Sequence, residues 1–164
     1  TTELTKQVVD VTRPNVSFDQ MTIDIYNSRV YLAGKHTWEP ITINLREDVN
    51  NNVQKLVGEQ LQKQFDFYEQ SSAASGLDYK FATRIEILDG GNGANTPTVL
   101  ETFELYGCYL ESANYNTLAY SAGTEPVTVT LAVRYDNAVQ TPQGTGIGTA
   151  IGRTVNTLVT GAGA

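Results

Sequence analysis

Apolar and polar residues alternate with a period of two along the N-terminal part of the chain, a pattern typical of half-buried β-strands. The alternation runs from Val8 to Val11 and resumes in the segment Met21–Ala33. Asn27–Ser28 interrupts it with residues that favour a tight turn. We therefore predict a short strand followed by a hairpin of Met21–Ile25 and Arg29–Ala33.

The spacing of apolar residues changes further along the chain. We expect a connector at Gly34–Pro40 and then a third strand at Ile41–Leu45. Between Val49 and Ser72 the apolar residues recur three or four positions apart, which predicts one amphipathic helix of about six turns. Asp48 immediately precedes this segment and is a candidate N-cap.

Alternation returns in the second half of the chain and predicts strands at Tyr79–Leu88, Leu100–Tyr109 and Val127–Tyr135. The turn-rich segment Asp89–Pro97 separates the first two of these as a hairpin tip. The order of elements indicates an α+β domain that is mainly β. We expect two packed antiparallel sheets, sandwich-like or barrel-like, with one flanking helix.

Length and charge narrow the function classes. The chain has 164 residues, enough for one domain with a hydrophobic core. Its 18 acidic residues outnumber the 11 lysines and arginines, for a net charge of −7, which argues against a surface that grips nucleic acid. No apolar run of about 18 residues is present and the first twenty residues lack a signal-peptide pattern, so we expect no membrane association.

Candidate catalytic groups are few. His36 is the one histidine, and no serine stands in a nucleophile motif that it would serve. Cys108 lies inside a predicted strand, where a small buried hydrophobic residue is the simpler interpretation, and the pair cannot make a structural zinc site. Glu47 and Asp48 are better explained by capping a helix than by acid–base chemistry. We therefore expect no enzyme activity, no catalytic residue, no cofactor and no metal site.

The segment Arg29–Ile43, RVYLAGKHTWEPITI, resembles the tail tube proteins of contractile-tailed bacteriophages. In that family an Arg-containing strand, a Gly turn, a Thr-aromatic-acidic triplet and a Thr-rich strand follow in this order. Val8–Pro14 resembles the family's short strand that ends in proline, and Thr124–Asp136 is similar to its closing strand. The resemblance thus spans Val8–Asp136.

The resemblance implies a structural protein of the virion tail, assembled in the host cytoplasm. Its copies would form homohexameric rings that stack into the inner tail tube, with the sheath and baseplate as further partners. The genome would pass through the lumen during ejection without specific binding, and a negatively charged wall would repel its phosphates. Residues 1–136 would form the tail-tube-like β domain, and the Gly, Thr and Ala-rich residues 137–164 a C-terminal extension.

Several alternatives stay open. The family normally has another strand before the segment that matches Val8, and the extension runs past the family's usual end; both departures fit a baseplate tube-initiator subunit, and equally a tube protein whose start is missing. A type VI secretion ring protein would have the same fold, whereas a small β-barrel module for sugars or peptides would stay monomeric. For subunit or inter-ring contacts we predict the connector Lys35–Pro40 and the long helix with its flanks, and for the lumen-side sheet the exposed faces of the hairpin Met21–Ala33 and of Val127–Tyr135. The side chains predicted at the subunit interface are Arg29, Lys35, His36, Thr37, Trp38, Glu39 and Arg134.

Overall fold

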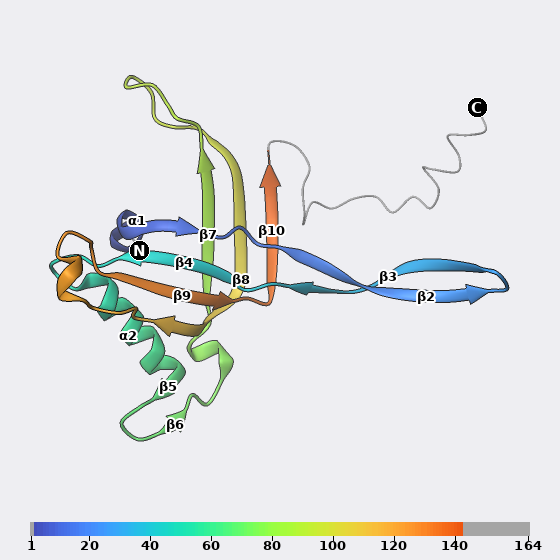
Figure 1. Cartoon of the computed structure of the whole chain (residues 1–164), viewed down its shortest axis with the longest axis horizontal. Helices are drawn as coiled ribbons and strands as arrows, with labels where there is room; N and C mark the ends of the chain where they lie inside the picture. The colour runs from blue at the N-terminus through green and yellow to red at the C-terminus, as the bar shows by residue number, and fades with distance from the viewer. Residues whose placement is uncertain (1, 143–164) are drawn as a thin grey trace.

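A computed structural model describes residues 2–142, which form a mainly β fold with one long helix (Figure 1). The predicted α+β class is confirmed. The helices are α1 (Thr2–Gln7) and α2 (Asn52–Gln64), with two short 3-10 helices at Gly76–Asp78 and Tyr120–Ala122. The strands are β1 (Val8–Val11), β2 (Val16–Ile25), β3 (Ser28–Trp38), β4 (Ile41–Arg46), β5 (Phe65–Asp66), β6 (Ser71–Ser72), β7 (Phe81–Leu88), β8 (Val99–Asn114), β9 (Thr128–Arg134) and β10 (Asn137–Pro142).

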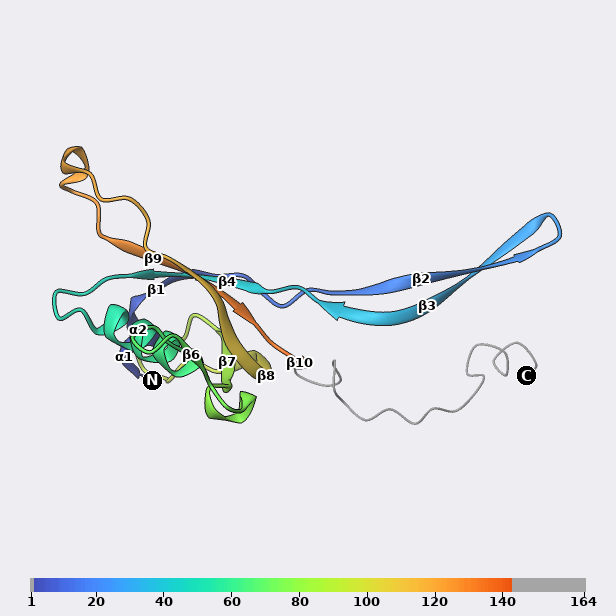
Figure 2. The ribbon, with the colours of Figure 1, turned by 90° about the horizontal axis from the view of Figure 1, so that it is seen from below.

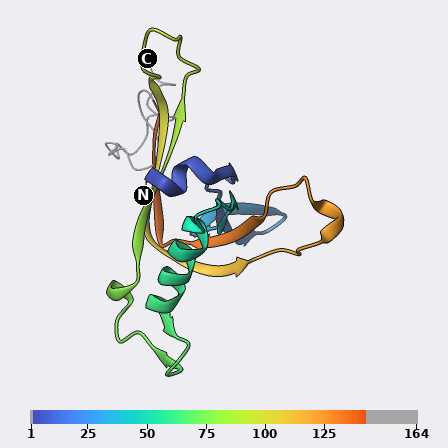
Figure 3. The same ribbon diagram turned by 90° about the vertical axis from the view of Figure 1, so that its left-hand side faces the viewer.

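Six strands make one curled antiparallel sheet in the order β1-β4-β9-β8-β10, with β7 also paired to β8. The two packed sheets predicted from the sequence are the two halves of this sheet, because β8 runs through both. Its C-terminal half pairs with β9, whereas its N-terminal half lies between β7 and β10. The two halves lie at a wide angle to one another (Figure 3).

The bend in β8 depends on Gly107. Its φ of +67° lies in the left-handed region, which favours glycine. A β-carbon at this position would overlap the carboxylate of Asp136, which lies against the bend. Asp136 in turn accepts a hydrogen bond from Lys80 Nζ at 2.7 Å. This bond, with a smaller contribution from the charge of Asp136, raises the pKa of Lys80.

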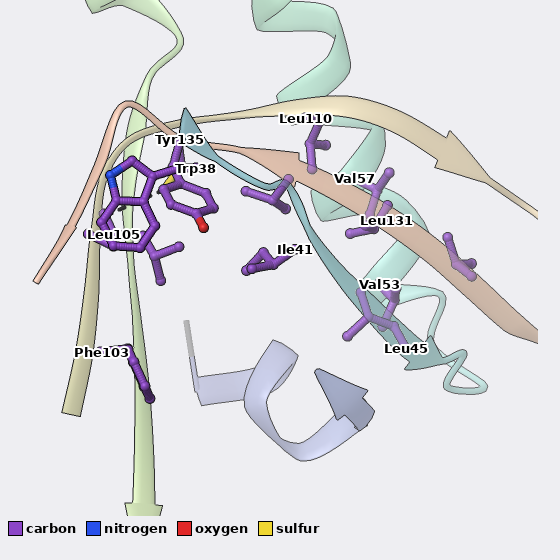
Figure 4. Close-up of a cluster of buried hydrophobic side chains, with 14 residues drawn as sticks. Trp38, Ile41, Leu45, Val53, Val57, Phe103, Leu105, Leu110, Leu131 and Tyr135 are labelled. Atoms are coloured by element: carbon purple, nitrogen blue, oxygen red, sulfur yellow. Dashed lines mark hydrogen bonds between the residues drawn. The ribbon is translucent and has the colours of Figure 1, made fainter. Parts of the chain in front are cut away.

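The core lies between α2 and one face of the sheet (Figure 4). Alternate residues of β4 and β9 point to this face, so Ile41, Leu45 and Val129 are fully buried. Val53 and Val57 cover them from α2, one helical turn apart. The complete buried cluster comprises Trp38, Ile41, Leu45, Val53, Val57, Phe103, Leu105, Cys108, Leu110, Val129, Leu131, Val133, Tyr135 and Ala138.

Helix α2 is shorter than the predicted segment 49–72, and its N-cap is Asn51 instead of Asp48. Asp48 accepts a hydrogen bond from the backbone of Val49 before the helix begins. The helix ends at Gln64 because Asp66 Oδ1 accepts hydrogen bonds from the next turn, including one from the backbone of Glu69 at 3.2 Å. This bond is the largest cause of a lowered pKa at Asp66, ahead of those from Gln62 and Tyr68.

The predicted hairpin is present, but it is longer and its turn lies elsewhere. Ser28 pairs with Ile25, so the loop is Tyr26–Asn27. The expected connector at Gly34–Pro40 is wrong, because β3 continues to Trp38. Glycine fits within the strand at Gly34 because a β-carbon there would lie 2.9 Å from the carbonyl oxygen of Asp19, which lies opposite a bulge of β3 at Gly34 and Lys35.

The later strands match the predicted segments, with β8 extended to Asn114. The turn-rich segment Asp89–Pro97 connects β7 to β8 as expected. Residues 137–142 of the predicted C-terminal extension form β10, whose Ala138 is buried, whereas residues 143–164 lie outside the described residues. Neither helix within residues 2–142 has the length and apolar character needed to cross a membrane.

Candidate assembly surface

The hairpin of β2 and β3 projects far beyond the other helices and strands of the described residues (Figures 1 and 2). Its two strands form a sheet of their own, paired with each other and with no other strand of the described chain. A two-stranded hairpin is marginal in water unless further strands or a helix cover one of its faces. The hairpin is therefore the element of this fold that most needs a partner.

One face of the hairpin is apolar and uncovered. Cross-strand partners share a face, so the register, which pairs Met21 with Leu32 and Ile23 with Val30, gathers the apolar side chains on one side. We call this side the apolar face of the hairpin. Its five members are each exposed over 41% to 53% of their surface: Met21, Ile23, Ile25, Val30 and Leu32.

Burying this face would release a substantial free energy. Moving an aliphatic or aromatic side chain fully out of water contributes about 1.5–3 kcal/mol, so the exposed half of each contributes about 1 kcal/mol. Five neighbouring side chains in this state form a contiguous apolar patch of the kind that marks protein–protein contact sites. The patch cannot be dismissed as isolated surface residues, because strand pairing places its members side by side.

The opposite face of the hairpin is polar and has its own contacts. Asp24 Oδ1 and Arg29 Nε form an ion pair at 3.0 Å, and both side chains are well exposed. Nearer the bulge, Gln20 Nε2 donates a hydrogen bond to Thr22 Oγ1 at 3.2 Å. This face also holds the exposed rings of Phe18 and Tyr31, but its charged and amide groups distinguish it from the apolar face.

The tip of the hairpin presents an aromatic side chain in an unusual backbone conformation. Tyr26 is fully exposed and has a φ of +47°, a region that bulky residues rarely adopt. Such a conformation costs of order 1–3 kcal/mol and is found most often at functional sites. Tyr26 thus adds a strained, exposed aromatic residue to the end of the apolar face.

Aromatic packing fixes the base of the hairpin to the body. The rings of His36 and Trp38 lie 6.4 Å apart, and those of Trp38 and Tyr135 lie 5.8 Å apart. Trp38 Nε1 and the hydroxyl of Tyr135 are buried without a hydrogen-bond partner among residues 2–142. Burial, followed by the negative charge of Glu39, raises the pKa of Tyr135 to about 12, so this hydroxyl stays protonated at neutral pH.

The seven predicted interface residues do not form one cluster. Lys35, Thr37 and Glu39 lie along the base of β3 and the residue after it, where Glu39 receives a weak hydrogen bond from Asn15 Nδ2 at 3.5 Å. Their neighbours on the other side of β3, His36 and Trp38, take part in the aromatic packing described above. Arg29 lies near the tip and pairs with Asp24 of its own hairpin, whereas Arg134 is half-buried in β9. Their role in a subunit interface stays a prediction.

The sequence analysis missed the apolar face of the hairpin as a site. The alternation from Met21 to Ala33 was the signal for it, but a period of two is equally typical of a strand whose apolar side is covered by its own domain. Only the structure shows that the domain ends before the hairpin does.

The polar side of the sheet has a charge different from that of the whole chain. This side faces away from α2, and its polar groups form a ladder across β1, β4 and β9. In this ladder Asn44 donates to Asp10 Oδ1 and accepts from Thr130 Oγ1, each at 2.7 Å. On these three strands the charged members of this side are one acid and two bases: Asp10, Arg46 and Arg134.

The chemically reactive candidates have structural surroundings. Cys108 is fully buried, its Sγ lies 3.4 Å from the carbonyl oxygen of Leu105, and burial raises the pKa of the thiol. Glu47 Oε1 accepts from the backbone of Asp48 at 3.3 Å, which places both carboxylates at the start of the turn before α2. Within the described residues, no three His, Cys, Asp or Glu side chains lie close enough to hold a metal ion.

The fold resembles tube-type proteins of contractile injection systems, whereas comparison with protein-family models and with curated proteins finds no match. It superimposes on a chain of the anti-feeding prophage baseplate, solved by cryo-EM with six-fold symmetry, with a TM-score of 0.61 and 9% identity, over 82% of this chain and 80% of that chain. A chain of the extended sheath–tube complex of the PVC extracellular contractile injection system gives 0.61 and 12%, over 82% and 80%. A crystal structure of an Hcp protein gives 0.53 and 11%, over 85% and 72%. The fold implied by the resemblance of Arg29–Ile43 to tail tube proteins is therefore confirmed.

Proposed function

We propose that this chain is a structural subunit that assembles with copies of itself into the tube of a contractile tail or injection device. The observation that carries this proposal is the projecting hairpin, whose apolar face has nothing to cover it in a single copy. A second copy of the chain is the simplest partner, because it is present wherever the first one is.

The shape of the molecule favours a ring over a symmetric pair. A projecting element that contacts a different surface of the next copy makes a head-to-tail interface, and such interfaces close into rings or continue as helical filaments. Ring closure also gives the exposed hairpin strands a permanent neighbour, which protects them from non-specific pairing. The six-fold symmetry of the baseplate structure with the same fold supports a homohexamer.

The finer parts of the proposal follow from the same comparison. Stacked rings would form the inner tube of a bacteriophage tail, a conduit for genome ejection, with sheath and baseplate proteins as neighbours. The structures with this fold come from a baseplate and from a sheath–tube complex, which supports tail partners and a place in the tail of the particle. A baseplate tube-initiator subunit is the second candidate, favoured by the similarity to the baseplate chain. We include no enzyme activity in the proposal.

Sedimentation and negative-stain electron microscopy of the purified chain over a range of concentrations test this function. We expect rings with a central channel at high concentration, and stacks or tubes at the highest. A chain that remains monomeric throughout would contradict the proposal and would favour a small ligand-binding β module instead.

A further inference from the structure

An apolar groove lies between α2 and the sheet, on the body of the molecule and away from the hairpin. It has a volume of about 230 Å³. Val57, Leu110 and Leu131 form its buried floor, and Figure 4 shows these three side chains close together. Leu56 of α2 and Phe81 of β7 are partly exposed at its sides.

The groove offers almost nothing to a polar or charged ligand. Among the described residues that line it, none is charged, and the polar ones are Gln60 and Thr83. Gln60 Nε2 already donates a hydrogen bond to the carbonyl oxygen of Tyr79 at 2.7 Å. An occupant of this groove therefore has to be apolar where it enters.

We propose that this groove receives the apolar face of the hairpin from a neighbouring copy of the chain. The inference rests on the proposed self-assembly and names the surface through which it occurs. The hairpin cannot fill the groove of its own chain, because it extends away from α2 in both views (Figures 1 and 2). The groove is too small for a whole strand but large enough for aliphatic side chains that project from one.

The two surfaces match in chemistry. The apolar face has no charged side chain among its five members, and the groove has none among its described lining residues. Gln60 Nε2 keeps its internal hydrogen bond to the carbonyl oxygen of Tyr79 when water is excluded, so this donor stays satisfied on contact. The charged pair Asp24–Arg29 lies on the opposite side of the hairpin, where it would stay in water.

A contact between hairpin and groove is head-to-tail, and this property gives a strict test. Ile23→Asp places a charge on the apolar face of the hairpin and leaves the groove of the same copy unchanged. Leu56→Asp places a charge at the groove and leaves the hairpin of the same copy unchanged. Each variant alone should fail to assemble. An equimolar mixture should form a one-to-one heterodimer through this contact, because the Leu56→Asp chain supplies the unmodified hairpin and the Ile23→Asp chain supplies the unmodified groove. Nothing larger should form through this contact, because each chain lacks its other docking surface.

Matched controls separate this contact from general effects of an added charge. Thr22→Asp places the same charge beside Ile23 on the polar face, and Gln54→Asp places it on an exposed position of α2. Both should assemble like the unmodified chain. Circular dichroism of each variant checks that it has folded.

Disulfide formation between single-cysteine partners provides a second measurement that does not depend on disrupting the contact. Chains with Ile23→Cys and with Leu56→Cys should form a mixed disulfide on oxidation, whereas Thr22→Cys with Leu56→Cys should not. The native Cys108 is fully buried and does not compete.

The outcomes distinguish this inference from the function on which it rests. If Leu56→Asp assembles normally while Ile23→Asp does not, or if the mixture of the two yields no heterodimer, the groove is not the docking site although self-assembly stands. If the unmodified chain never associates, the proposed function fails, and the inference fails with it.

Discussion

Trimming the apolar face of the hairpin should weaken assembly by an amount that the structure allows us to calculate. Ile23→Ala together with Val30→Ala removes carbons from a cross-strand pair on that face. Each carbon removed by these substitutions would contribute about 0.8 kcal/mol to association if it moved fully out of water, and together the carbons would contribute about 4 kcal/mol. Because Ile23 and Val30 are only 44% and 41% exposed in the free chain, assembly gains a corresponding share of that energy. We therefore expect a loss of about 1.7 kcal/mol per contact, or about 20-fold in the dissociation constant.

Sedimentation velocity across a concentration series measures this shift in the midpoint of assembly. Thr22→Ala is the matched control, because it shortens a side chain of the same hairpin that lies on the polar face. The free energy of unfolding of the monomer should change by about 1 kcal/mol or less in either variant, the usual size of a cross-strand pair. A midpoint that moves equally in both variants, or in neither, would refute the assignment of the apolar face to the subunit contact.

Three further predictions concern the body of the molecule. Gly107→Ala should lower the free energy of unfolding by about 2 kcal/mol in a denaturant titration, because of its positive φ and the overlap with Asp136; no loss would mean that the bend adjusts freely. Gln64→Leu should lower the free energy of unfolding by about 1–3 kcal/mol and speed hydrogen exchange at the amide of Leu110, because the backbone N–H and C=O of Leu110 both form hydrogen bonds with the Gln64 side chain. Unchanged exchange at Leu110 would contradict this role of Gln64. The carboxyl group of Asp66, followed by NMR through its carboxyl carbon, should titrate with a pKa below the ordinary value of 3.8. The ionised carboxylate therefore stabilises the turn after α2 above pH 3.8, and this stabilisation is lost as the pH falls through the lowered pKa. A titration midpoint above 3.8 would contradict this prediction.

The strands were predictable because each has a period-two pattern with a consistent apolar side. Val129, Leu131 and Val133 show this in β9, where these alternate apolar residues are the buried ones. The same period-two pattern does not show that the apolar side of the hairpin is left uncovered. A pattern shows which side of a strand is apolar, but the part of the molecule that covers that side depends on contacts distant in sequence.

The end of α2 shows a competition that spacing alone does not reveal. Apolar residues at Leu61, Phe65 and Tyr68 continue the helical spacing past Gln64. The chain leaves the helix there because Asp66 accepts hydrogen bonds from the following backbone, and Gln64 satisfies the free edge of β8 instead. Side-chain hydrogen bonds of this kind outweigh a continued stripe of apolar residues.

The assembly surface was only partly within reach of the sequence. Arg29 is among the side chains predicted at the subunit interface, and in the structure it pairs with Asp24, which lies directly across its own hairpin. The groove could not be predicted, because its lining combines residues as far apart in sequence as Ile43, Leu56, Phe81 and Leu131. Such a site exists only once the sheet has curled and α2 has packed on it.

The net charge of the chain does not determine the charge of any one face, and this bears on what a tube made of it would do. The chain has a formal charge of −7, but the polar side of β1, β4 and β9 has two basic members, Arg46 and Arg134, and one acidic member, Asp10. Fields from exposed charges fade over about 10 Å at 0.1 M salt, so a molecule in a channel responds mainly to the side chains that line it. A channel lined by the polar side would therefore not repel phosphate. The hypothesis of an acidic wall requires another surface to face the lumen, whereas assembly through the hairpin does not depend on which surface does.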